Sequence, residues 1–193
     1  MKPILLFVSH VVPLSLSSGQ KQRVFHMVTQ ARKYFKVLFL TFAVEEKMDE
    51  IRLGMENIVD ECIVLPSLSQ RNLFFKYLNI VKANIYTLKT GLKNSNFFIS
   101  EVEITKQRIE EALINKKIDI VIYEYWHAWK SLSVFTQYKK PVILDMHDIL
   151  SNAYKGQLEN KKWLAMSLKK RFLRRYIKEE HKAWSNFDGI ISI

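Results

Sequence analysis

The order of apolar runs along the chain is the feature that most constrains its fold. Short continuous apolar runs occur at residues 4–9, 37–42, 62–65, 118–123, 142–146 and 189–193, and longer segments with helical spacing separate them. Runs of this length predict strands buried on both faces, and strands that alternate with helices usually pair in parallel. We therefore expect an α/β fold with a doubly wound, mostly parallel sheet of about six strands and helices on both faces.

Helical spacing predicts the elements between these runs. The first helix begins near Gln20, because apolar residues then recur at intervals of four, three and four residues. Between the third and fourth strands, the sequence predicts a helix over 73–92 and a second over 102–116, with a break at residues 94–96. The apolar face of the 73–92 helix would carry Phe74, Tyr77, Leu78, Val81, Ile85 and Leu88.

Polar and titratable residues follow three of the predicted strands. Asp145, His147 and Asp148 end the fifth run, and His10 follows the first. The fourth run leads into Glu124, Tyr125 and His127. Because ligands bind beyond the carboxyl ends of the strands in a parallel α/β sheet, we expect these side chains to line one crevice.

The loop before the first helix is a second candidate site. Ser17, Ser18 and Gly19 precede the helix, whose first N–H groups and dipole favour an anion. The spacing matches neither the G-x-G-x-x-G fingerprint nor a Walker loop. An ordinary serine cap explains the same residues equally well. Lys21 and Arg23 favour the anion site.

The residues at the strand ends also suggest a metal-dependent hydrolase. Asp145, His147 and Asp148, with Glu124 and His127, are residue types that bind divalent ions. No His-x-x-His or Glu-x-x-His pair on a helix supports such a site, so we expect no metal. A His147 ring that hydrogen-bonds a ligand hydroxyl or a carboxylate is the favoured interpretation, and the hydrolase remains an alternative.

Basic residues are concentrated in one segment. The chain has a net charge of +11, and residues 161–182 contain nine Lys or Arg and two Glu, a net +7. The segment predicts a helix with an apolar stripe of Met166, Leu173, Ile177 and Trp184. Such a helix can lie on anionic lipid, or pack on the sheet with a solvated basic face, and both readings stay open. A basic anion- or nucleic-acid-binding module is a further alternative, although no paired surface aromatics on strands support nucleic acid.

The remaining sequence features concern the compartment. Cys62 is the single cysteine, which excludes an internal disulfide and fits a reducing compartment. The apolar run after Met1, Lys2 and Pro3 is too short for a secretory signal, and no window approaches the ~20 apolar residues of a membrane span. We expect a cytoplasmic protein, possibly peripheral on the inner face of the cell membrane.

Taken in order, these segments resemble the N-terminal, acceptor-side half of a GT-B fold glycosyltransferase of the retaining family 4 type. The resemblance covers essentially the whole chain and is carried by Pro13, Ser18-Gly19 and Arg23 after the first strand, and by the segments 119–124, 140–148 and 188–193. It implies a single Rossmann-like domain over residues 1–193. It also implies an enzyme that transfers a hexose from a nucleotide-sugar donor to a glycan or lipid-linked acceptor, with no further cofactor.

The resemblance also implies roles for individual residues. His147 would lie near the donor sugar, and Ser18, Gly19, Gln20 and Arg23 would approach the donor diphosphate. His10, Glu124, Tyr125, His127 and Asp148 would lie on the acceptor side. Segments 73–93 and 161–182 would suit contact with an anionic membrane. Ser18 stands where the family often has a glycine, which weakens the expected approach to the diphosphate.

The resemblance further implies a second domain. In such enzymes a second Rossmann-like half carries a Glu-x7-Glu carboxylate pair and holds the nucleotide sugar. The chain ends within a predicted strand, so we expect a piece of a longer protein that is inactive alone. Glu103 and Glu111 have the same spacing, but they precede the fourth strand and are treated as a coincidence.

Overall fold

The computed structural model describes residues 2–69, 73–136 and 139–192. Six parallel strands form one sheet in the order β3-β2-β1-β4-β5-β6. The strands are β1 (Ile4–Val8), β2 (Lys36–Ala43), β3 (Glu61–Pro66), β4 (Ile120–Glu124), β5 (Val142–Met146) and β6 (Gly189–Ser192). This order confirms the predicted doubly wound α/β, Rossmann-like fold.

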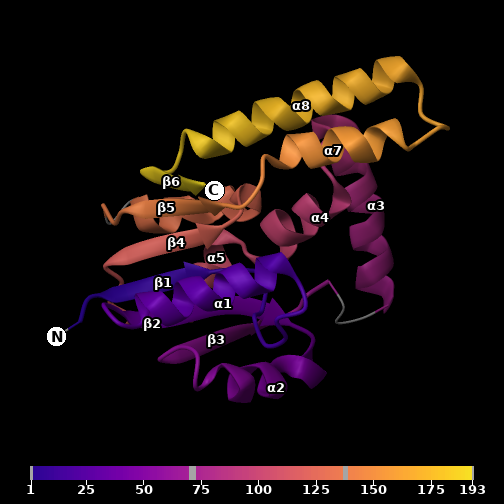
Figure 1. Cartoon of the computed structure of the whole chain (residues 1–193). Helices are drawn as coiled ribbons and strands as arrows, with labels where there is room; N and C mark the ends of the chain where they lie inside the picture. Colours follow the sequence, from indigo (N-terminus) through magenta and orange to yellow (C-terminus); the bar gives the residue numbers. More distant parts are fainter. Residues whose placement is uncertain (1, 70–72, 137–138, 193) are drawn as a thin grey trace.

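Helices cover both faces of the sheet (Figure 1). On one face, α1 (Gly19–Ala31) and α2 (Glu45–Met55) pack on β1, β2 and β3. The opposite face is covered by a π-helix, a 3-10 helix, α5 and α6, and α7 and α8 pack beside β5. Their bounds are Phe98–Glu103 for the π-helix, Trp126–Leu132 for the 3-10 helix, Lys106–Ala112 for α5, Ser133–Thr136 for α6, Leu150–Glu159 for α7 and Met166–Trp184 for α8.

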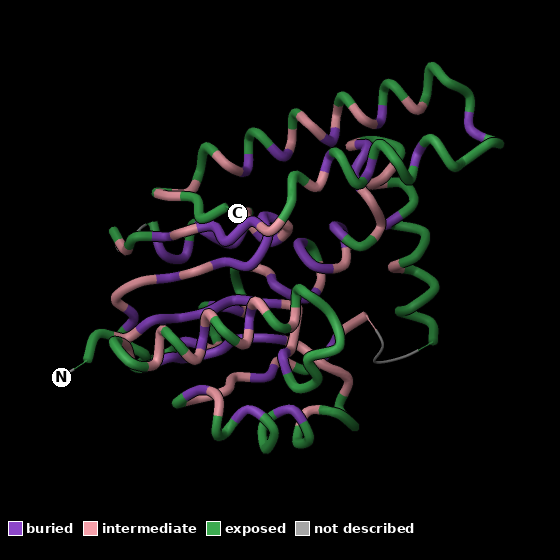
Figure 2. The backbone as a smooth tube through the Cα atoms, in the orientation of Figure 1, coloured by how far each residue is buried: buried purple, intermediate pink, exposed green. Residues whose placement is uncertain are grey.

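The core lies in the strands and in the helix faces that meet them, as the buried colour in Figure 2 shows. Leu6 and Val8 point to one side of β1, and Leu5 and Phe7 point to the other. All four side chains are at most 2% exposed. Burial on both faces explains why these strands are continuous apolar runs and not alternating patterns.

Three aspartates close the amino-terminal edge of the sheet. Asp60, Asp119 and Asp188 each stand just before a strand, and each exchanges two hydrogen bonds with the first residues of the neighbouring strand. The Asp119 N–H donates to the Ile4 carbonyl at 2.9 Å, and its Oδ2 accepts from the Ile4 N–H at 2.9 Å. Asp60 pairs with Val37 and Asp188 with Val142 in the same way. The carboxylates satisfy strand N–H groups that the ladder leaves unpaired.

The long connection between β3 and β4 differs from its prediction. The first helix, α3, spans Leu73–Thr90, and the chain turns at Gly91, where φ is +77°, before α4 (Asn94–Phe97). The predicted break at residues 94–96 is therefore wrong by about one turn. A Cβ at Gly91 would lie 2.9 Å from the Phe172 carbonyl oxygen of α8, so the close approach of α3 to α8 also requires glycine. The predicted 102–116 helix is replaced by the π-helix and the shorter α5.

The structure shows which apolar faces are covered, and one burial prediction, that for β6, is wrong. The apolar face of α3 is largely exposed: Tyr77, Val81 and Leu88 are each more than half exposed. The buried line of α8 runs through Phe172, Tyr176, Glu180 and Ala183, while Met166 is 62% exposed. Strand β6 was predicted to be buried, but it pairs with β5 alone among the described strands and leaves Ile190 and Ile191 exposed. Helical spacing identified these elements but not which side is covered.

Replacing Asp119 tests the role of the strand-end aspartates. We expect Asp119→Ala to lower the free energy of unfolding by about 1–2 kcal/mol, because it leaves a half-buried N–H without an acceptor. Asp119→Asn keeps an acceptor and should lose less. Urea denaturation measures both, with Asp49→Ala on the exposed face of α2 as the control. Equal losses for Asp119→Ala and Asp49→Ala would contradict the assignment.

Candidate functional site

The carboxyl ends of β1, β4 and β5 form one polar rim. The strand order reverses direction between β1 and β4, which is the topological switch point where α/β sheets bind ligands. Ser9 follows β1, Glu124 ends β4, and Asp145 lies in β5 opposite Glu124 in the register. All three are buried. The structure thus brings together Glu124 and Asp145, which the sequence singled out, with Ser9, which it did not.

An ion pair between Arg23 and Asp145 joins α1 to the rim. The turn of α1 that points Val24 and Val28 into the core turns Arg23 toward β5. Its Nε lies 3.1 Å from Oδ2 and 3.2 Å from Oδ1 of Asp145, and a second guanidinium nitrogen also binds Oδ1. The Asp145 side chain is fully buried, and the Arg23 side chain is 14% exposed.

This contact fixes the charge of Asp145. Burial would raise the pKa of the Asp145 carboxyl, but its contacts with His147 and Arg23 together outweigh burial, so the pKa is lowered. The hydrogen bonds to Asp145 likewise raise the pKa of Arg23. Both groups are therefore charged at neutral pH. The approach of Arg23 to a donor diphosphate stays a prediction, and in the structure its guanidinium binds Asp145.

Glu124 has the opposite protonation behaviour. Its Oε2 accepts a hydrogen bond from the Ser9 hydroxyl, while burial, together with the nearby Asp145 charge, raises its pKa to about 8. At pH 7 this carboxyl is mostly protonated. Two carboxyl groups on neighbouring strands thus carry different charges, a pattern that separates acid from base roles in enzyme sites.

His147 faces both carboxyl groups. Its Nε2 atom lies 3.2 Å from Asp145 Oδ2 and 3.5 Å from Glu124 Oε1, although neither contact has hydrogen-bond geometry. The side chain is 9% exposed, and its ring lies 4.9 Å from the ring of Tyr125. A small rotation of the imidazole would complete a bond to either carboxyl. The His147 imidazole is therefore largely shielded from solvent and lies within reach of both carboxyl groups.

Tyr125, His10 and His127 form an aromatic wall beside His147. The ring centroids lie 5.7–5.9 Å apart. Tyr125 adopts a φ of +61°, an uncommon conformation for a side chain of this size. Its hydroxyl accepts a hydrogen bond of 2.7 Å from Gln20 at the start of α1. The strained backbone and the bond to α1 hold the ring over the rim.

The two histidines of this wall are neutral. Burial, followed by the nearby His147, lowers the pKa of His10 to about 4. Burial, followed by His10, lowers the pKa of His127 to about 3. Asn96 of α4 bonds the His127 Nδ1 at 2.9 Å and fixes its ring. Neutral imidazoles suit hydrogen bonds to hydroxyl groups better than the binding of anions.

The loop before α1 ends next to this rim. Ser18 caps the helix through its Oγ, which accepts from the Lys21 N–H at 3.4 Å. The first helical hydrogen bond is donated by Gln22 to the Ser18 carbonyl, so the N–H groups of Gly19 and Gln20 precede it. Ser18, Gly19 and Gln20 are exposed. The serine therefore caps the helix, as one reading predicted, and the anion site stays a prediction.

Asp148 was predicted to belong to the site, whereas Ser9 and Asn96 were not. Asp148 is exposed and borders, with His147 and Ser192, a hollow of about 500 Å³ beyond the ends of β5 and β6. The sequence analysis missed Ser9 as a partner of Glu124, although a serine that ends an apolar strand was a usable signal. Asn96 had no such signal, because it comes from the connection between β3 and β4.

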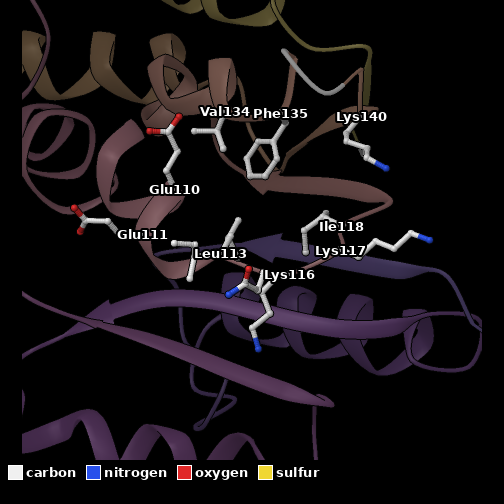
Figure 3. Close-up of a pocket in the computed structure, with 11 residues that line it drawn as sticks. Glu110, Glu111, Leu113, Lys116, Lys117, Ile118, Val134, Phe135 and Lys140 are labelled. Carbon is white, nitrogen blue, oxygen red and sulfur yellow. The ribbon is translucent and has the colours of Figure 1, made fainter.

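A larger hollow of about 580 Å³ lies at the opposite edge of the sheet (Figure 3). Leu113, Ile118, Val134 and Phe135 line it, with the lysine Lys140 at its border. It opens beside the start of β4 and is separated by the length of the strands from the rim. Its size does not make it the candidate site, because the converging titratable groups lie at the other edge.

The hydrolase alternative would need several metal ligands to converge at the rim. Within residues 2–69, 73–136 and 139–192, no three His, Cys, Asp or Glu side chains are arranged to hold an ion. Asp145 accepts hydrogen bonds from Arg23, and Glu124 Oε2 accepts one from the Ser9 hydroxyl. The carboxylates that the hydrolase alternative requires therefore already have other partners.

Comparisons with known proteins show similarity of the fold and not of the sequence. No protein-family model matches the chain, and no curated protein matches its sequence. The crystal structure of LpCGTa in complex with UDP aligns with 100% of this chain and 46% of its own, at TM-score 0.52 and 12% identity. A UDP-glucosyltransferase from Polygonum tinctorium, solved with 3,4-dichloroaniline, aligns with 100% of this chain and 46% of its own, at TM-score 0.52 and 6% identity.

A third structure is of a related kind. A putative UDP-N-acetylglucosamine 2-epimerase from Listeria monocytogenes aligns with 100% of this chain and 39% of its own, at TM-score 0.50 and 10% identity. The chain thus spans less than half the length of each of these three structures. At these identities the likeness concerns the fold, and it supports the GT-B type that the sequence resembles.

In the described part of the chain, no helix combines the length and apolar character needed to cross a membrane.

Replacing Arg23 should destabilise the fold, because it leaves the buried Asp145 carboxylate without its partner. We expect Arg23→Met to lower the free energy of unfolding by about 3 kcal/mol at pH 7. The control is Arg52→Met, which breaks the exposed pair with Asp49 and should cost less than about 1 kcal/mol. A double variant, Arg23→Met with Asp145→Asn, should recover part of the loss.

The pH dependence follows from the lowered pKa of Asp145. A carboxyl whose pKa is lower in the folded protein than in the unfolded chain stabilises the fold above the unfolded pKa of about 4. This contribution is lost as the pH falls through the folded pKa. The difference between wild type and Arg23→Met should therefore be largest near pH 7 and shrink below about pH 4. A difference that stays constant over this range would contradict the ion pair.

Proposed function

We propose that this chain is the acceptor-side half of a retaining GT-B glycosyltransferase of the family 4 type. The enzyme would transfer a sugar from a nucleotide-sugar donor to a glycan or a lipid-linked acceptor. A second Rossmann-like half would hold the donor nucleotide and form the other wall of the cleft. Transfer would require both halves.

One observation carries this proposal. Glu124, Asp145 and His147 converge at the switch point of the sheet, and the first turn of α1 lies beside them. Fold alone does not determine function, so the weight rests on this site. The fold likeness to UDP-bound and UDP-sugar-dependent structures supports a nucleotide sugar as the donor.

The start of α1 would act on the leaving group. Transfer of a sugar from a nucleotide diphosphate builds negative charge on the departing oxygen, and oriented N–H groups stabilise such charge. The N–H groups of Gly19 and Gln20 would take this role, and the Ser18 cap at the start of α1 supports it. Arg23 would act indirectly, by keeping Asp145 ionised and α1 fixed to the rim.

His147 would position the donor sugar. With Nε2 directed toward the two carboxyl groups, the imidazole is held from one side and can hydrogen-bond a sugar hydroxyl from the other. We assign it as a positioning hydrogen-bond partner and assign no base. A mostly protonated Glu124 can donate a hydrogen bond in the same crevice. His10, Tyr125 and His127 would form the acceptor side with Asp148 at its exposed end.

Contact with an anionic membrane is part of the proposal. Helix α3 exposes Tyr77, Val81 and Leu88, and α8 carries most of the basic residues of the segment 161–182. Figure 2 shows that both helices present a largely exposed surface away from the sheet. Apolar side chains next to a basic surface favour anionic lipid. Such contact would bring the crevice to a lipid-linked acceptor from the cytoplasmic side.

His147→Ala tests the proposed site. In the protein that combines this chain with its donor-binding half, we expect kcat/KM for transfer to fall about a hundredfold, because a positioned polar group is lost. The unfolding temperature should change little. His26→Ala, at an exposed position on α1, is the matched control and should keep full activity. Turnover equal to wild type in His147→Ala would remove His147 from the site.

Vesicle binding tests the membrane contact. The chain should bind vesicles that contain phosphatidylglycerol more strongly than phosphatidylcholine vesicles, and added salt should weaken the binding. Val81→Asp should reduce it, because the substitution places a negative charge on the exposed face of α3. Tyr34→Asp adds the same charge at an exposed position after α1 and should have a smaller effect. Equal binding to both vesicle types in a flotation assay would refute the contact.

A further inference from the structure

A cationic hollow separate from the rim lies between α3–α4 and α7–α8. It has a volume of about 650 Å³ and is lined by residues of all these segments, which lie together at one end of the molecule (Figure 1). Among the described residues that line it, Lys93 and Lys161 are the charged ones and none is Asp or Glu. Neither role proposed above uses this hollow.

The two lysines of the hollow contact aromatic rings. The Lys93 ammonium lies over the rings of Tyr154 and Tyr176, 5.2 and 5.9 Å from their centroids. Lys161 lies 5.9 Å from the ring centroid of Trp163. Across the described ranges, neither lysine forms an ion pair with a carboxylate. Burial, followed by repulsion from Lys161, lowers the pKa of Lys93. An anion in the hollow would relieve both effects, because it would neutralise two neighbouring cations.

The entrance to the hollow is apolar. Trp163 is 79% exposed and Leu88 is 65% exposed, while Phe172 and Leu164 line the interior and are buried. Exposed side chains of this size at the mouth of a cationic hollow suit a ligand with both an anionic and an apolar part. A phosphate with an attached alkyl or isoprenoid chain has this chemistry.

The hollow is connected to the acceptor side of the rim. Lys93 precedes α4, and Asn96 of the same short helix holds His127. The Lys93 charge also contributes to the lowered pKa of His127. A phosphate bound at Lys93 would therefore lie one helix turn from Asn96, whose side chain contacts His127 on the proposed acceptor side.

We infer that this hollow binds the phosphate of an amphipathic acceptor, with its apolar chain leaving past Trp163 and Leu88. The inference rests on the proposed function, because it names the acceptor class of the same crevice. It assigns Lys93 and Lys161 to the phosphate and the exposed side chains at the mouth to the chain. The acceptor would enter from the side on which α3 exposes its apolar face.

Calorimetric titration of this chain with n-octyl phosphate tests the inference. Inorganic phosphate and the neutral amphiphile octyl glucoside are the two comparison ligands. Octyl phosphate and octyl glucoside are each used below the concentration at which they form micelles. Octyl phosphate should bind at least about tenfold more tightly than either comparison ligand, because it alone has both an anionic phosphate and an apolar chain. Lys93→Gln should weaken octyl phosphate about tenfold. Lys178→Gln removes the same charge from an exposed site on α8 and should leave the affinity unchanged.

Each outcome decides one part of the inference. If inorganic phosphate binds as tightly as octyl phosphate, the apolar part is wrong and the site takes a free anion. If octyl glucoside binds equally, or if Lys178→Gln weakens binding as much as Lys93→Gln, the cationic hollow is not the site. Trp163→Ala should weaken octyl phosphate but not inorganic phosphate, and thermal melts confirm that each variant folds. No nucleotide sugar enters this experiment, so its failure leaves the transfer test of His147 unaffected.

Discussion

The ion pair between Arg23 and Asp145 is the interaction on which the rim depends. It ties the first helix to the fifth strand across the switch point of the sheet, and it compensates for a fully buried carboxylate. Burial is the main cause of the raised pKa of Glu124, and the charge of the ionised Asp145 adds to it, so Glu124 keeps its proton at neutral pH. His147 faces both groups. The charge pair thus contributes to the protonation of a second carboxyl and to the surroundings of the imidazole.

Much of the sheet could be predicted because its strands are buried on both faces. Continuous apolar runs such as Ile4–Val8 leave little ambiguity, and the strand-end positions of Glu124, Asp145 and His147 followed from the parallel arrangement. Burial of the helices and of the edge strand could not be read in the same way. Helical spacing shows which residues share a face, but tertiary contacts decide whether that face is covered, as α3 and β6 demonstrate.

The partners within the site were the least predictable part. Arg23 was expected to bind phosphate, yet the geometry of α1 directs its guanidinium to a carboxylate 122 residues away. Asn96 comes from the connection between β3 and β4, where a π-helix and a glycine turn replace the regular pattern. Contacts between residues distant in sequence leave no local signal. In the proposed transferase, the same connection supplies His127 with its partner and borders the cationic hollow.

The most direct test of this account is the pKa of Glu124, measured from the chemical shift of its carboxyl carbon by NMR across pH 4–10, with Glu124→Gln to assign the signal. The account predicts a midpoint near 8 for Glu124, while Asp145 remains ionised throughout that range. A midpoint near the ordinary glutamate value of about 4.3 would contradict it. Both carboxyl groups would then be charged at neutral pH, and Glu124 could not act as a hydrogen-bond donor beside an ionised Asp145.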